Sequence, residues 1–502
     1  MYLMDVMYGR ISISDDYYEN VIMTKGFQRL KQIAQTSYVN FFPKASYNRM
    51  THSIGVYYLG SIAVKQLYKT SIDMDVRILL NKYEETFLLA CLLHDYGHFP
   101  FSHVGEYIIQ KQNRAININL IQEIYKLIDN DNFQKDFEQM QKKYGQSYIA
   151  LHELIGVILS LNDFKFFFKR KKINIELFVR MILGCCYQNY TKEHQIQNAL
   201  ICLLHGNGMD LDFADCVMRS AFIFGLNVNM WNFRVCEFIN EIRIEIKERS
   251  CLDMTARGAQ FLFEWYKIYL YEVMNYQKDA RVQQYIAKLQ GDLDFLISSD
   301  KRFDTACEKT EKIYTYSKEI LPRMNDTDIL DMKLTYSSNE SVQHSLWSNY
   351  REYQREVYLF DRRLVNTLKI FYEKLSNYQS EDGFLLINEE LLNEFIIHEE
   401  NLECTVFVQS LLSFCDKKNY FLSLKYLPVK GYDISNRLFG SYWKVTENGE
   451  SYPLLEFFQR HYDFNYLVCE DFYYLYVKDK KDFSKDFWLE YLNYYNTNIK
   501  NV

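Results

Sequence analysis

The chain has 502 residues, with 18 glycines, 5 prolines and 43 tyrosines, and its formal net charge is −7. This charge gives no general attraction to nucleic acid or to acidic membranes, although local basic runs leave nucleic-acid binding open. No apolar run approaches the roughly 20 residues that a membrane-spanning helix needs. Because residues that break helices are scarce, we expect long helices, and the length predicts two or three domains.

The first part of the chain, residues 17–289, has the pattern of helices joined by short connections. Apolar residues recur at helical spacing in MTHSIGVYYLGSIAVKQLYK (50–69), and EETFLLACLLHD (84–95) is almost continuously apolar. Such segments are typical of helices that lie in a core. The sequence therefore predicts a mainly α fold, with a helical domain over residues 1–300.

The composition changes after residue 300. Residues 325–345 are polar and rich in turn formers, which predicts a linker or mobile segment over 301–348. Residues 349–502 combine helical patterns with YWKVTENGESY (442–452), a hairpin that turns at Asn448–Gly449. We expect a smaller C-terminal region of mixed α/β structure there.

The segment CLLHDYGHFPFSHVGE (91–106) carries three of the ten histidines of the chain. His94 and Asp95 end an apolar helix, and adjacent helical side chains point about 100° apart, so both can reach one ion. Imidazole and carboxylate suit Mn, Fe, Co, Ni or Zn. Further ligands must come from other segments, and His52 and Asp212 are the candidates. The alternative is a polar bend between two helices.

A second pair follows Pro100, where a new helix can begin. His103 and Glu106 lie three residues apart, which places them on one helical face. A carboxylate that accepts a hydrogen bond from an imidazole fixes its tautomer and raises its basicity. The pair therefore suits proton transfer, and the alternative is an ordinary surface pair.

Four ordered motifs resemble those of the HD-domain metal phosphohydrolases. They are GFQRLKQIAQ…FFPKASYNRMTHSIGV (26–56), HDYGHFPFSHVGE (94–106), LHELIG (151–156) and NGMDLDFADCVMR (207–219). The resemblance is strongest to the deoxynucleoside triphosphate triphosphohydrolases, which include bacterial dGTPases and the mammalian sterile-alpha-motif and HD-domain dNTPase. It implies that residues 1–300 form an HD-domain helical bundle that hydrolyses deoxynucleoside triphosphates to deoxynucleoside and tripolyphosphate.

The resemblance also implies a role for individual residues. The implied metal ligands are His52, His94, Asp95 and Asp212. The implied catalytic residues, which act at the α-phosphate, are His98, His103, Glu106 and His152. The implied substrate-binding residues are Gln35, Arg49, Tyr276 and Gln277. The arginine that the family has ahead of Tyr276 is absent, and Lys267 is the nearest cation and the candidate in its place. Asp210 and Asp215 lie close to Asp212 and are alternatives to it as the fourth ligand.

The chain departs from the family pattern beside Asp212. Phe213 replaces a lysine, Cys216 replaces a tyrosine that stacks on the sugar, and Ser220 replaces an acidic residue. These changes affect contacts to the triphosphate and the sugar rather than to the metal. An HD phosphohydrolase acting on another nucleotide or phosphate ester, and a nucleotide-sensing scaffold, therefore stay as alternatives.

The resemblance implies a divalent transition metal as cofactor and leaves Mg²⁺ on the substrate phosphates open. It also implies a nucleotide substrate and a homo-oligomer, and it leaves an activating nucleotide open. The eleven cysteines show no CxxC pair, which is typical of reduced thiols. Together with the lack of a basic-then-apolar signal pattern, this predicts a cytoplasmic protein without membrane partners.

Overall fold

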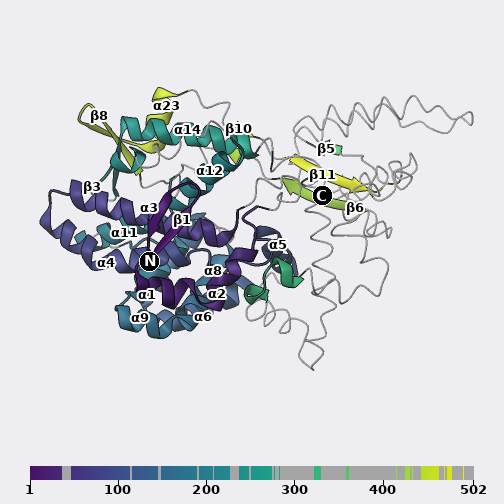
Figure 1. Cartoon of the computed structure of the whole chain (residues 1–502). Helices are drawn as coiled ribbons and strands as arrows, with labels where there is room; N and C mark the ends of the chain where they lie inside the picture. Colours follow the sequence, from purple (N-terminus) through teal and green to yellow (C-terminus); the bar gives the residue numbers. More distant parts are fainter. Residues whose placement is uncertain are drawn as a thin grey trace, which may run out of the picture. The chain divides into compact units, whose positions relative to one another are not determined.

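The computed structural model divides the chain into two compact units (Figure 1). Unit 1 contains Met1–Gln277, Gln290–Val342 and Ile434–Leu467, and unit 2 contains Lys278–Leu289, Gln343–Asp433 and Val468–Val502. The domain boundaries predicted after residues 300 and 348 lie outside the described residues. The structure describes residues 1–36, 47–112, 116–144, 149–188, 191–206, 209–225, 237–247, 250–273, 276, 282, 321–329, 358–360, 414, 424–429, 432–433, 443–462, 468–469, 472–477, 490 and 494.

Unit 1 is mainly helical, and small sheets accompany the helices, so the predicted mainly α fold class is confirmed. Its main helices are α3 (Arg49–Thr70), α4 (Met74–Leu93), α5 (His103–Gln112), α6 (Ile116–Ile128), α7 (Asp131–Tyr144), α8 (Leu151–Asp163), α9 (Lys165–Lys171), α10 (Ile175–Leu183), α11 (Lys192–Leu204), α12 (Leu211–Ile223) and α14 (Ala256–Glu272). The shorter ones are α1 (Asp15–Tyr17), η1 (Tyr18–Ile22), α2 (Lys25–Gln28), η2 (Arg29–Gln32), η8 (Leu321–Arg323) and α23 (Leu454–His461).

Helices α3 and α4 form the centre of unit 1, and α12 packs against α3 while α10 and α11 pack against α4 (Figure 1). Each begins at a residue whose side chain accepts a backbone N–H of the first turn, Asn48 for α3 and Asp73 for α4. The C-terminal half of α4, from Thr86 to Leu93, is buried throughout. This explains why its sequence lacks a polar stripe, and it fixes where His94 leaves the helix.

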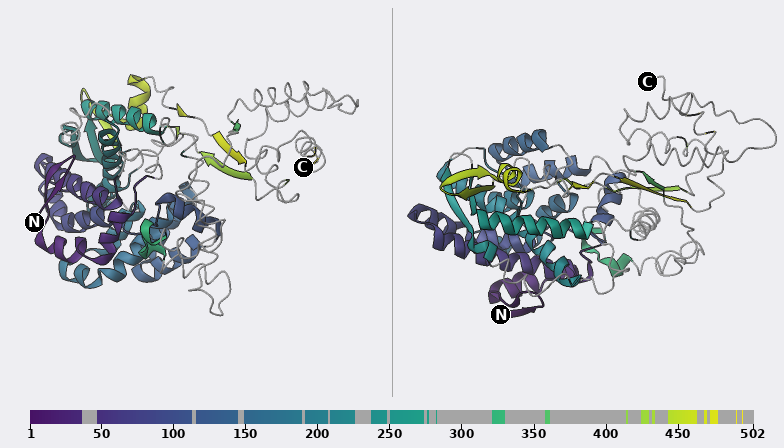
Figure 2. Two further views of the ribbon diagram at one scale, coloured as in Figure 1. Left: turned by 45° about the vertical axis from the view of Figure 1, so that its right-hand side comes forward. Right: turned by 90° about the horizontal axis from the view of Figure 1, so that it is seen from above.

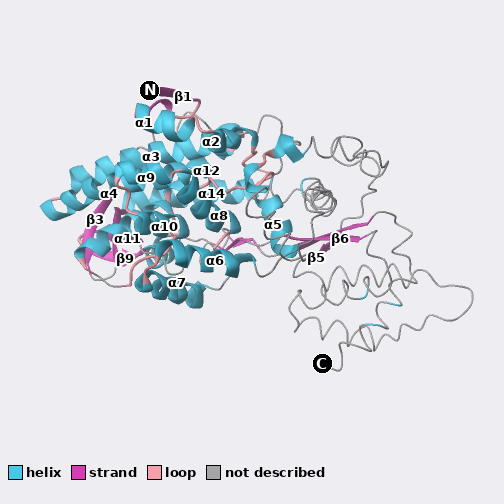
Figure 3. Cartoon of the chain, turned by 90° about the horizontal axis from the view of Figure 1, so that it is seen from below, coloured by secondary structure: helices cyan, strands magenta, loops and turns pink. Residues whose placement is uncertain are grey.

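A four-stranded sheet lies at one side of these helices (Figure 3). Its order is β3 (Ile242–Lys247), β4 (Ser250–Thr255), β8 (Trp443–Glu447) and β9 (Glu450–Pro453), and β4 pairs with β8 in parallel. The prediction of helices throughout residues 17–289 is wrong for β3 and β4. The sequence IRIEIK alternates apolar and charged residues, which is the period of a strand rather than a helix.

The hairpin predicted at Asn448–Gly449 is confirmed. These two residues join β8 to β9, and their φ angles are 52° and 84°. A two-residue hairpin loop of this kind needs positive φ at both positions, which asparagine and glycine adopt more readily than other residues. The sequence therefore specified this turn locally.

The remaining strands are short. The N-terminal hairpin joins β1 (Tyr2–Asp5) to β2 (Gly9–Ser12) and lies with the N-terminal helices in both views of Figure 2. In unit 2, the strands are β5 (Tyr358–Phe360), β6 (Leu424–Val429), β7 (Tyr432–Asp433), β10 (Val468–Cys469) and β11 (Phe472–Val477). Strand β11 lies between β5 and β6, and β10 pairs with β7. Among the helices described, none has the length and apolar character needed to cross a membrane.

Candidate metal and proton-transfer site

Three predicted metal ligands meet where α3, α4 and α12 converge. His52 lies in the first turn of α3, His94 ends α4, and Asp212 lies in the first turn of α12. His52 Nε2 is 2.8 Å from Asp212 Oδ1 and 3.3 Å from His94 Nε2, and His94 Nε2 is 3.7 Å from Asp212 Oδ1. These donor atoms are close enough together to share one metal ion.

The other ring nitrogen of each histidine is already engaged. His52 Nδ1 donates to Asp215 Oδ2 at 2.7 Å, and His94 Nδ1 donates to the carbonyl oxygen of Cys91 at 2.9 Å. These bonds fix the rings with both Nε2 atoms directed at Asp212, the arrangement usual for histidines that bind a metal. Two imidazole nitrogens and a carboxylate oxygen suit a divalent transition metal, so the residues present fit the predicted cofactor.

The charge balance around His52 also favours a cation. Burial lowers the pKa of His52, but the hydrogen bonds and charges of Asp212 and Asp215 outweigh burial and raise it to about 10. The surroundings therefore stabilise positive charge at this position. A metal ion bound here would replace a proton.

Asp95, the fourth predicted ligand, is buried beside this cluster. Its Oδ1 lies 3.5 Å from His94 Nε2, and its Oδ2 lies 3.7 Å from His52 Nε2 and 2.9 Å from Arg49. Burial raises the pKa of Asp95, but the charges of Arg49, His94 and His98 outweigh burial and hold it well below its usual range. The carboxylate is therefore ionised, but Asp95 is not among the three residues whose donor atoms converge, and its role as the fourth ligand stays a prediction.

Arg49 is turned inward rather than toward solvent. Its guanidinium donates to Asp95 Oδ2, to Ser102 Oγ at 3.0 Å and to the carbonyl oxygen of Gln35 at 3.3 Å. These bonds use three of its five N–H groups, so Arg49 braces Asp95 and the Ser102 turn, and its predicted contact with phosphate stays a prediction. Gln35 itself is buried beside it.

A second group of histidines lies next to the first. His98 stacks on His152 with ring centroids 3.8 Å apart, and His103 meets both edge-on at 5.1 and 5.3 Å. His98 and His152 are buried, whereas 66% of the His103 side chain is exposed. His98 Nε2 is also 3.1 Å from Asp95 Oδ1, so the two groups are adjacent.

Glu106 lies at the centre of this second group. Its Oε2 is 3.1 Å from His103 Nδ1 and 3.1 Å from His152 Nδ1, and its Oε1 accepts the backbone N–H groups of Leu151 and His152. Burial raises the pKa of Glu106, but His152 and His103 outweigh burial and hold it well below its usual range. Conversely, Glu106 raises the pKa of His152 to about 9 despite its burial. A permanent negative charge thus sits between two imidazoles.

Gly97 allows α8 to approach the segment that carries these groups. A Cβ at Gly97 would lie 2.2 Å from the carbonyl oxygen of His152 and 2.3 Å from the backbone nitrogen of Gly156. Both neighbours are backbone atoms, so no side chain can move aside. The glycine in HDYGH and the glycine in LHELIG therefore pair in space, and their contact brings His152 onto His98.

Two predicted substrate-binding residues have other described contacts. Lys267 pairs with Glu264 on α14 at 2.6 Å, and the ring of Tyr276 stacks on Phe224 at 3.8 Å. Gln277 lies outside the described residues. The roles predicted for these three residues in substrate binding stay predictions.

The structure adds a buried network that the sequence reading missed. Asp215, considered only as an alternative to Asp212, accepts hydrogen bonds from His52, from Arg219 at 2.9 and 3.1 Å, and from the hydroxyl of Tyr8 at 2.8 Å. Arg219 also pairs with Asp5 at 2.9 Å. The four-residue spacing of Asp215 and Arg219 on α12 was a usable signal for their pair, whereas Asp5 and Tyr8 are too distant in sequence.

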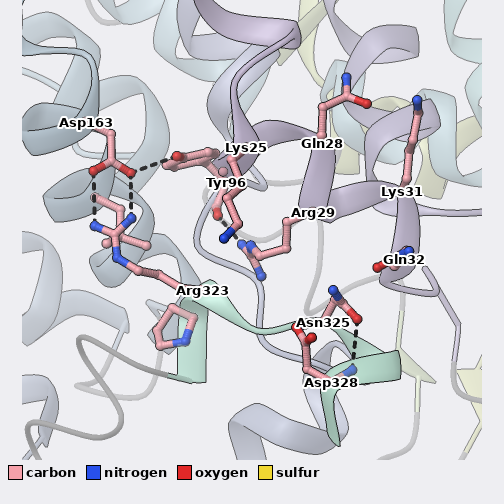
Figure 4. A pocket seen from close by; sticks show the side chains of 13 residues that line it. Lys25, Gln28, Arg29, Lys31, Gln32, Tyr96, Asp163, Arg323, Asn325 and Asp328 are labelled. Atoms are coloured by element: carbon pink, nitrogen blue, oxygen red, sulfur yellow. Dashed lines mark hydrogen bonds and ion pairs between the residues drawn. The ribbon is translucent and has the colours of Figure 1, made fainter. Parts of the chain in front are cut away.

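A cavity of about 690 Å³ opens elsewhere in unit 1 (Figure 4). Arg29, Lys25 and Lys31 line it together with Arg323, which pairs with Asp163 across the cavity wall. No predicted metal ligand is among its described lining residues. It is therefore distinct from the metal and proton-transfer site.

Comparison with known proteins agrees with this geometry. Residues 49–156 match the family described as HD domain, and this span includes His52, His94, Asp95 and the Glu106 group. The sequence resemblance to dNTP triphosphohydrolases is confirmed over this region. These matches concern this region of the chain and leave the activity of the whole protein as a proposal.

Two relatives with a similar sequence match a limited part of the chain. The chain is 39% identical over 106 residues to a deoxynucleoside triphosphate triphosphohydrolase SAMHD1 homolog of Dictyostelium discoideum, which is 20% of this chain and 19% of that protein. It is 44% identical over 89 residues to the Xenopus laevis SAMHD1 enzyme, which is 17% of this chain and 13% of that one. The match thus spans a fifth or less of these two relatives.

A hypothetical protein from Aquifex aeolicus has the same fold over 98% of this chain and 99% of its own, with a TM-score of 0.58 and 15% identity. A Bacteroides thetaiotaomicron phosphohydrolase aligns over 95% of this chain and 100% of its own, with a TM-score of 0.51 and 16% identity. At these identities the likeness concerns the fold alone.

Proposed function

We propose that the chain hydrolyses deoxynucleoside triphosphates to deoxynucleoside and tripolyphosphate in a metal-dependent reaction. The observation that carries this proposal is the adjacency of two groups: the converging donor atoms of His52, His94 and Asp212, and the Glu106 carboxylate between His103 and His152. One group suits a cation that binds phosphate, and the other suits proton transfer. The relatives named as dNTP triphosphohydrolases supply the substrate class.

His52, His94, Asp95 and Asp212 would hold the metal. When bound, a divalent metal supplies Lewis acidity toward phosphate oxygens. Arg49 keeps Asp95 ionised and in place through its 2.9 Å ion pair. The half-exposed Asp212 leaves the cluster open on one side, which gives a substrate phosphate access to it.

His103 is the member of the second group that a substrate can reach, because most of its side chain is exposed. Its Nδ1 lies 3.1 Å from Glu106 Oε2, so the carboxylate holds the tautomer in which Nε2 exchanges a proton. The fixed charge of Glu106 stabilises the imidazolium that forms when His103 takes up that proton. We assign proton transfer at the α-phosphate to His103. Glu106 orients its ring, and the rings of His98 and His152 pack against it.

One observation favours a second candidate, hydrolysis of another nucleotide or phosphate ester. The positions four and eight residues after Asp212 on α12 are uncharged: they are Cys216 and Ser220, and both lie near the Tyr47 hydroxyl. Phe213 is buried against Tyr266, with ring centroids 5.3 Å apart, and offers no charge. A substrate whose sugar needs neither a cation nor a carboxylate would fit beside Phe213, Cys216 and Ser220.

The experiment is a nucleotide panel with Mn²⁺ in ¹⁸O-labelled water, with products resolved by chromatography and mass spectrometry. Attack at the α-phosphorus predicts nucleoside and intact tripolyphosphate, with the label in tripolyphosphate only. Pyrophosphate or orthophosphate as the first product would refute the proposal and favour the second candidate. The Asp212→Asn variant is the control for hydrolysis by a contaminant, since it removes a ligand and should abolish turnover.

Three further points belong to this proposal. Manganese is the first metal to test among Mn, Fe, Co, Ni and Zn, and elemental analysis of the purified protein decides between them. We also propose that the chain acts in the cytoplasm as a homo-oligomer, and light scattering across protein concentrations tests the assembly. An activating nucleotide would show as a lag or a sigmoidal rate curve when one nucleotide is varied against another.

A further inference from the structure

Residues 321–329, which we call the 321–329 strap, lie against the HD domain although they are far from it in sequence. Arg323 pairs with Asp163 at 3.1 and 3.0 Å, as Figure 4 shows, and Arg29 donates to the carbonyl oxygen of Met324 at 3.0 Å. The same guanidinium nitrogen of Arg29 donates to the carbonyl oxygen of His98 at 2.8 Å. The buried guanidinium of Arg29 thus donates hydrogen bonds both to the strap and to the segment that carries the second histidine group.

Asp326 of the strap contacts the segment that leads into His103. Its Oδ1 accepts the backbone N–H of Phe101 at 2.6 Å, and its Oδ2 accepts the backbone N–H of Ala34 at 3.1 Å. Two amides that lie 67 positions apart are therefore held by a single carboxylate. An ionised carboxylate is suited to this because each of its oxygens accepts a hydrogen bond.

The amide at Phe101 belongs to an unusual turn. Phe101 and Ser102 have φ angles of 57° and 54°, in the left-handed region that residues with a Cβ rarely adopt. Neither residue is glycine, so the conformation must be held by its surroundings. Helix α5 begins directly after this turn, and its first residue is His103.

Ala34 closes a ring of contacts around the turn. Its N–H donates to Asp326, and its carbonyl oxygen accepts the hydroxyl of Ser102 at 2.6 Å. Arg49 donates to the same Ser102 oxygen at 3.0 Å. The strap thus holds the turn at Phe101, while Ala34 and Arg49 hold it at Ser102. Ala34 links the two contacts, because it bonds both to Asp326 and to Ser102.

We propose that Asp326 is a positioning residue for proton transfer: it holds residues 99–102 in their left-handed turn and thereby keeps His103 against Glu106. This role rests on the proposed function only in its final step, the use of His103 by the reaction. The structural part, that the Asp326 carboxylate restrains the turn, stands independently of any activity. Asp326 touches neither substrate nor metal ligand and acts through the turn.

The test compares Asp326→Asn with Asp328→Asn. Asparagine at 326 keeps the volume but presents an NH₂ group to one of the two amides, so one hydrogen bond is replaced by two opposed donors. Asp328 lies in the same strap, and among the contacts described its carboxylate accepts only the backbone N–H of Asn325, while its own N–H donates to Asn325 Oδ1. Its change to asparagine is therefore the matched control. Asp326→Glu retains both acceptors and serves as the conservative variant.

The first readout is amide hydrogen exchange of peptides covering residues 96–106. We expect faster exchange there in Asp326→Asn, intermediate exchange in Asp326→Glu and no change in Asp328→Asn, with α4 protected in all three. Unchanged exchange at 96–106 in a folded Asp326→Asn protein would overturn the proposal. If Asp326→Asn does not fold, Asp326→Glu against Asp328→Asn decides by the same comparison.

The second readout is steady-state kinetics with metal content measured in parallel. We expect kcat of Asp326→Asn to fall about 10- to 100-fold, the scale of a misplaced reacting group, with KM and metal content unchanged and partial rescue by glutamate. Faster exchange with wild-type kcat would overturn the link to His103. A wild-type protein that hydrolyses no nucleotide would refute the proposed function, while the exchange data would still decide whether Asp326 holds the turn.

Discussion

The buried contacts of Asp215 predict that this residue controls metal affinity although it is not a ligand. The perturbation is Asp215→Asn, which keeps the shape of the side chain and removes its charge. In the structure, the carboxylate accepts hydrogen bonds from His52 Nδ1 at 2.7 Å, from Arg219 and from Tyr8. Alanine would be a poorer choice, because it would leave the buried Arg219 with only Asp5 as a charged partner.

The expected loss can be worked from these contacts. Asparagine still accepts one hydrogen bond, so the ring of His52 stays in place, but its Nε2 becomes a weaker donor to a metal. Removing such a partner of a metal-binding histidine typically costs 10- to 100-fold in affinity, or about 1.4–2.7 kcal/mol. Because Arg219 retains Asp5 at 2.9 Å, the fold should survive.

The assay is titration of metal-free protein with Co²⁺ or Mn²⁺ in competition with a chelator. Three variants of α12 and its N-terminal cap form a matched set. Asp212→Asn should lose affinity most, Asp215→Asn should lose the intermediate amount, and Asp210→Asn should bind as the wild type does. Asp210 caps α12 by accepting the N–H of Phe213 through Oδ1, a role that asparagine fills equally well, and among the contacts described only its 3.2 Å bond from the N–H of Gly206 would be lost. Wild-type affinity in Asp215→Asn, or an equal loss in Asp210→Asn, would refute the reasoning.

Three other residues of the site and its surroundings, Glu106, Gly97 and Asp326, also give testable predictions. Glu106→Gln should lower turnover about 10²-fold, the scale of general acid–base catalysis, with metal content unchanged by elemental analysis; loss of metal would contradict the separation of the two groups. Gly97→Ala should destabilise the fold by about 3 kcal/mol in thermal or urea unfolding, because its Cβ meets backbone atoms of α8 at 2.2–2.3 Å. Burial raises the pKa of Asp326 from 3.8 to about 6. The folded protein therefore binds this proton more tightly than the unfolded chain, so its stability falls by at most about 3 kcal/mol as pH rises from 4 to 6 and then stays level. The free energy of unfolding of Asp326→Asn, measured across this range, should lack that part of the slope.

The sequence predicted the parts of the site that short segments specify. His94 and Asp95 end a helix whose apolar run is visible in the sequence, and the structure buries that run as expected. The i,i+3 spacing of His103 and Glu106 likewise sufficed to predict their contact, which is 3.1 Å between Nδ1 and Oε2. The turn at Asn448–Gly449 was predictable because its backbone angles suit these residue types.

The contacts between distant segments could not be predicted in this way. Asp326 lies in a stretch that reads as polar linker, and nothing in its neighbours indicates that its oxygens meet Ala34 and Phe101. Asp5 likewise lies 214 positions from Arg219, its partner. Spacing rules describe neighbours on one helix or strand, whereas these pairs depend on how whole elements pack.

A continuous series of contacts from α12 to α8 joins the two groups of histidines. His52 and His94 face Asp212, Asp95 lies beside both, and its Oδ1 is 3.1 Å from His98 Nε2. His98 in turn stacks on His152, whose Nδ1 faces Glu106. Burial and the Arg49 charge hold the pKa of His98 well below its usual range, so this ring is neutral. His98 thus lies between the Asp95 carboxylate and the His152 ring, whose charged form Glu106 stabilises, and it adds no charge of its own. The Arg49–Asp95 pair and the His152–Glu106 pair can therefore each stay ionised while the buried ring of His98 between them carries no charge.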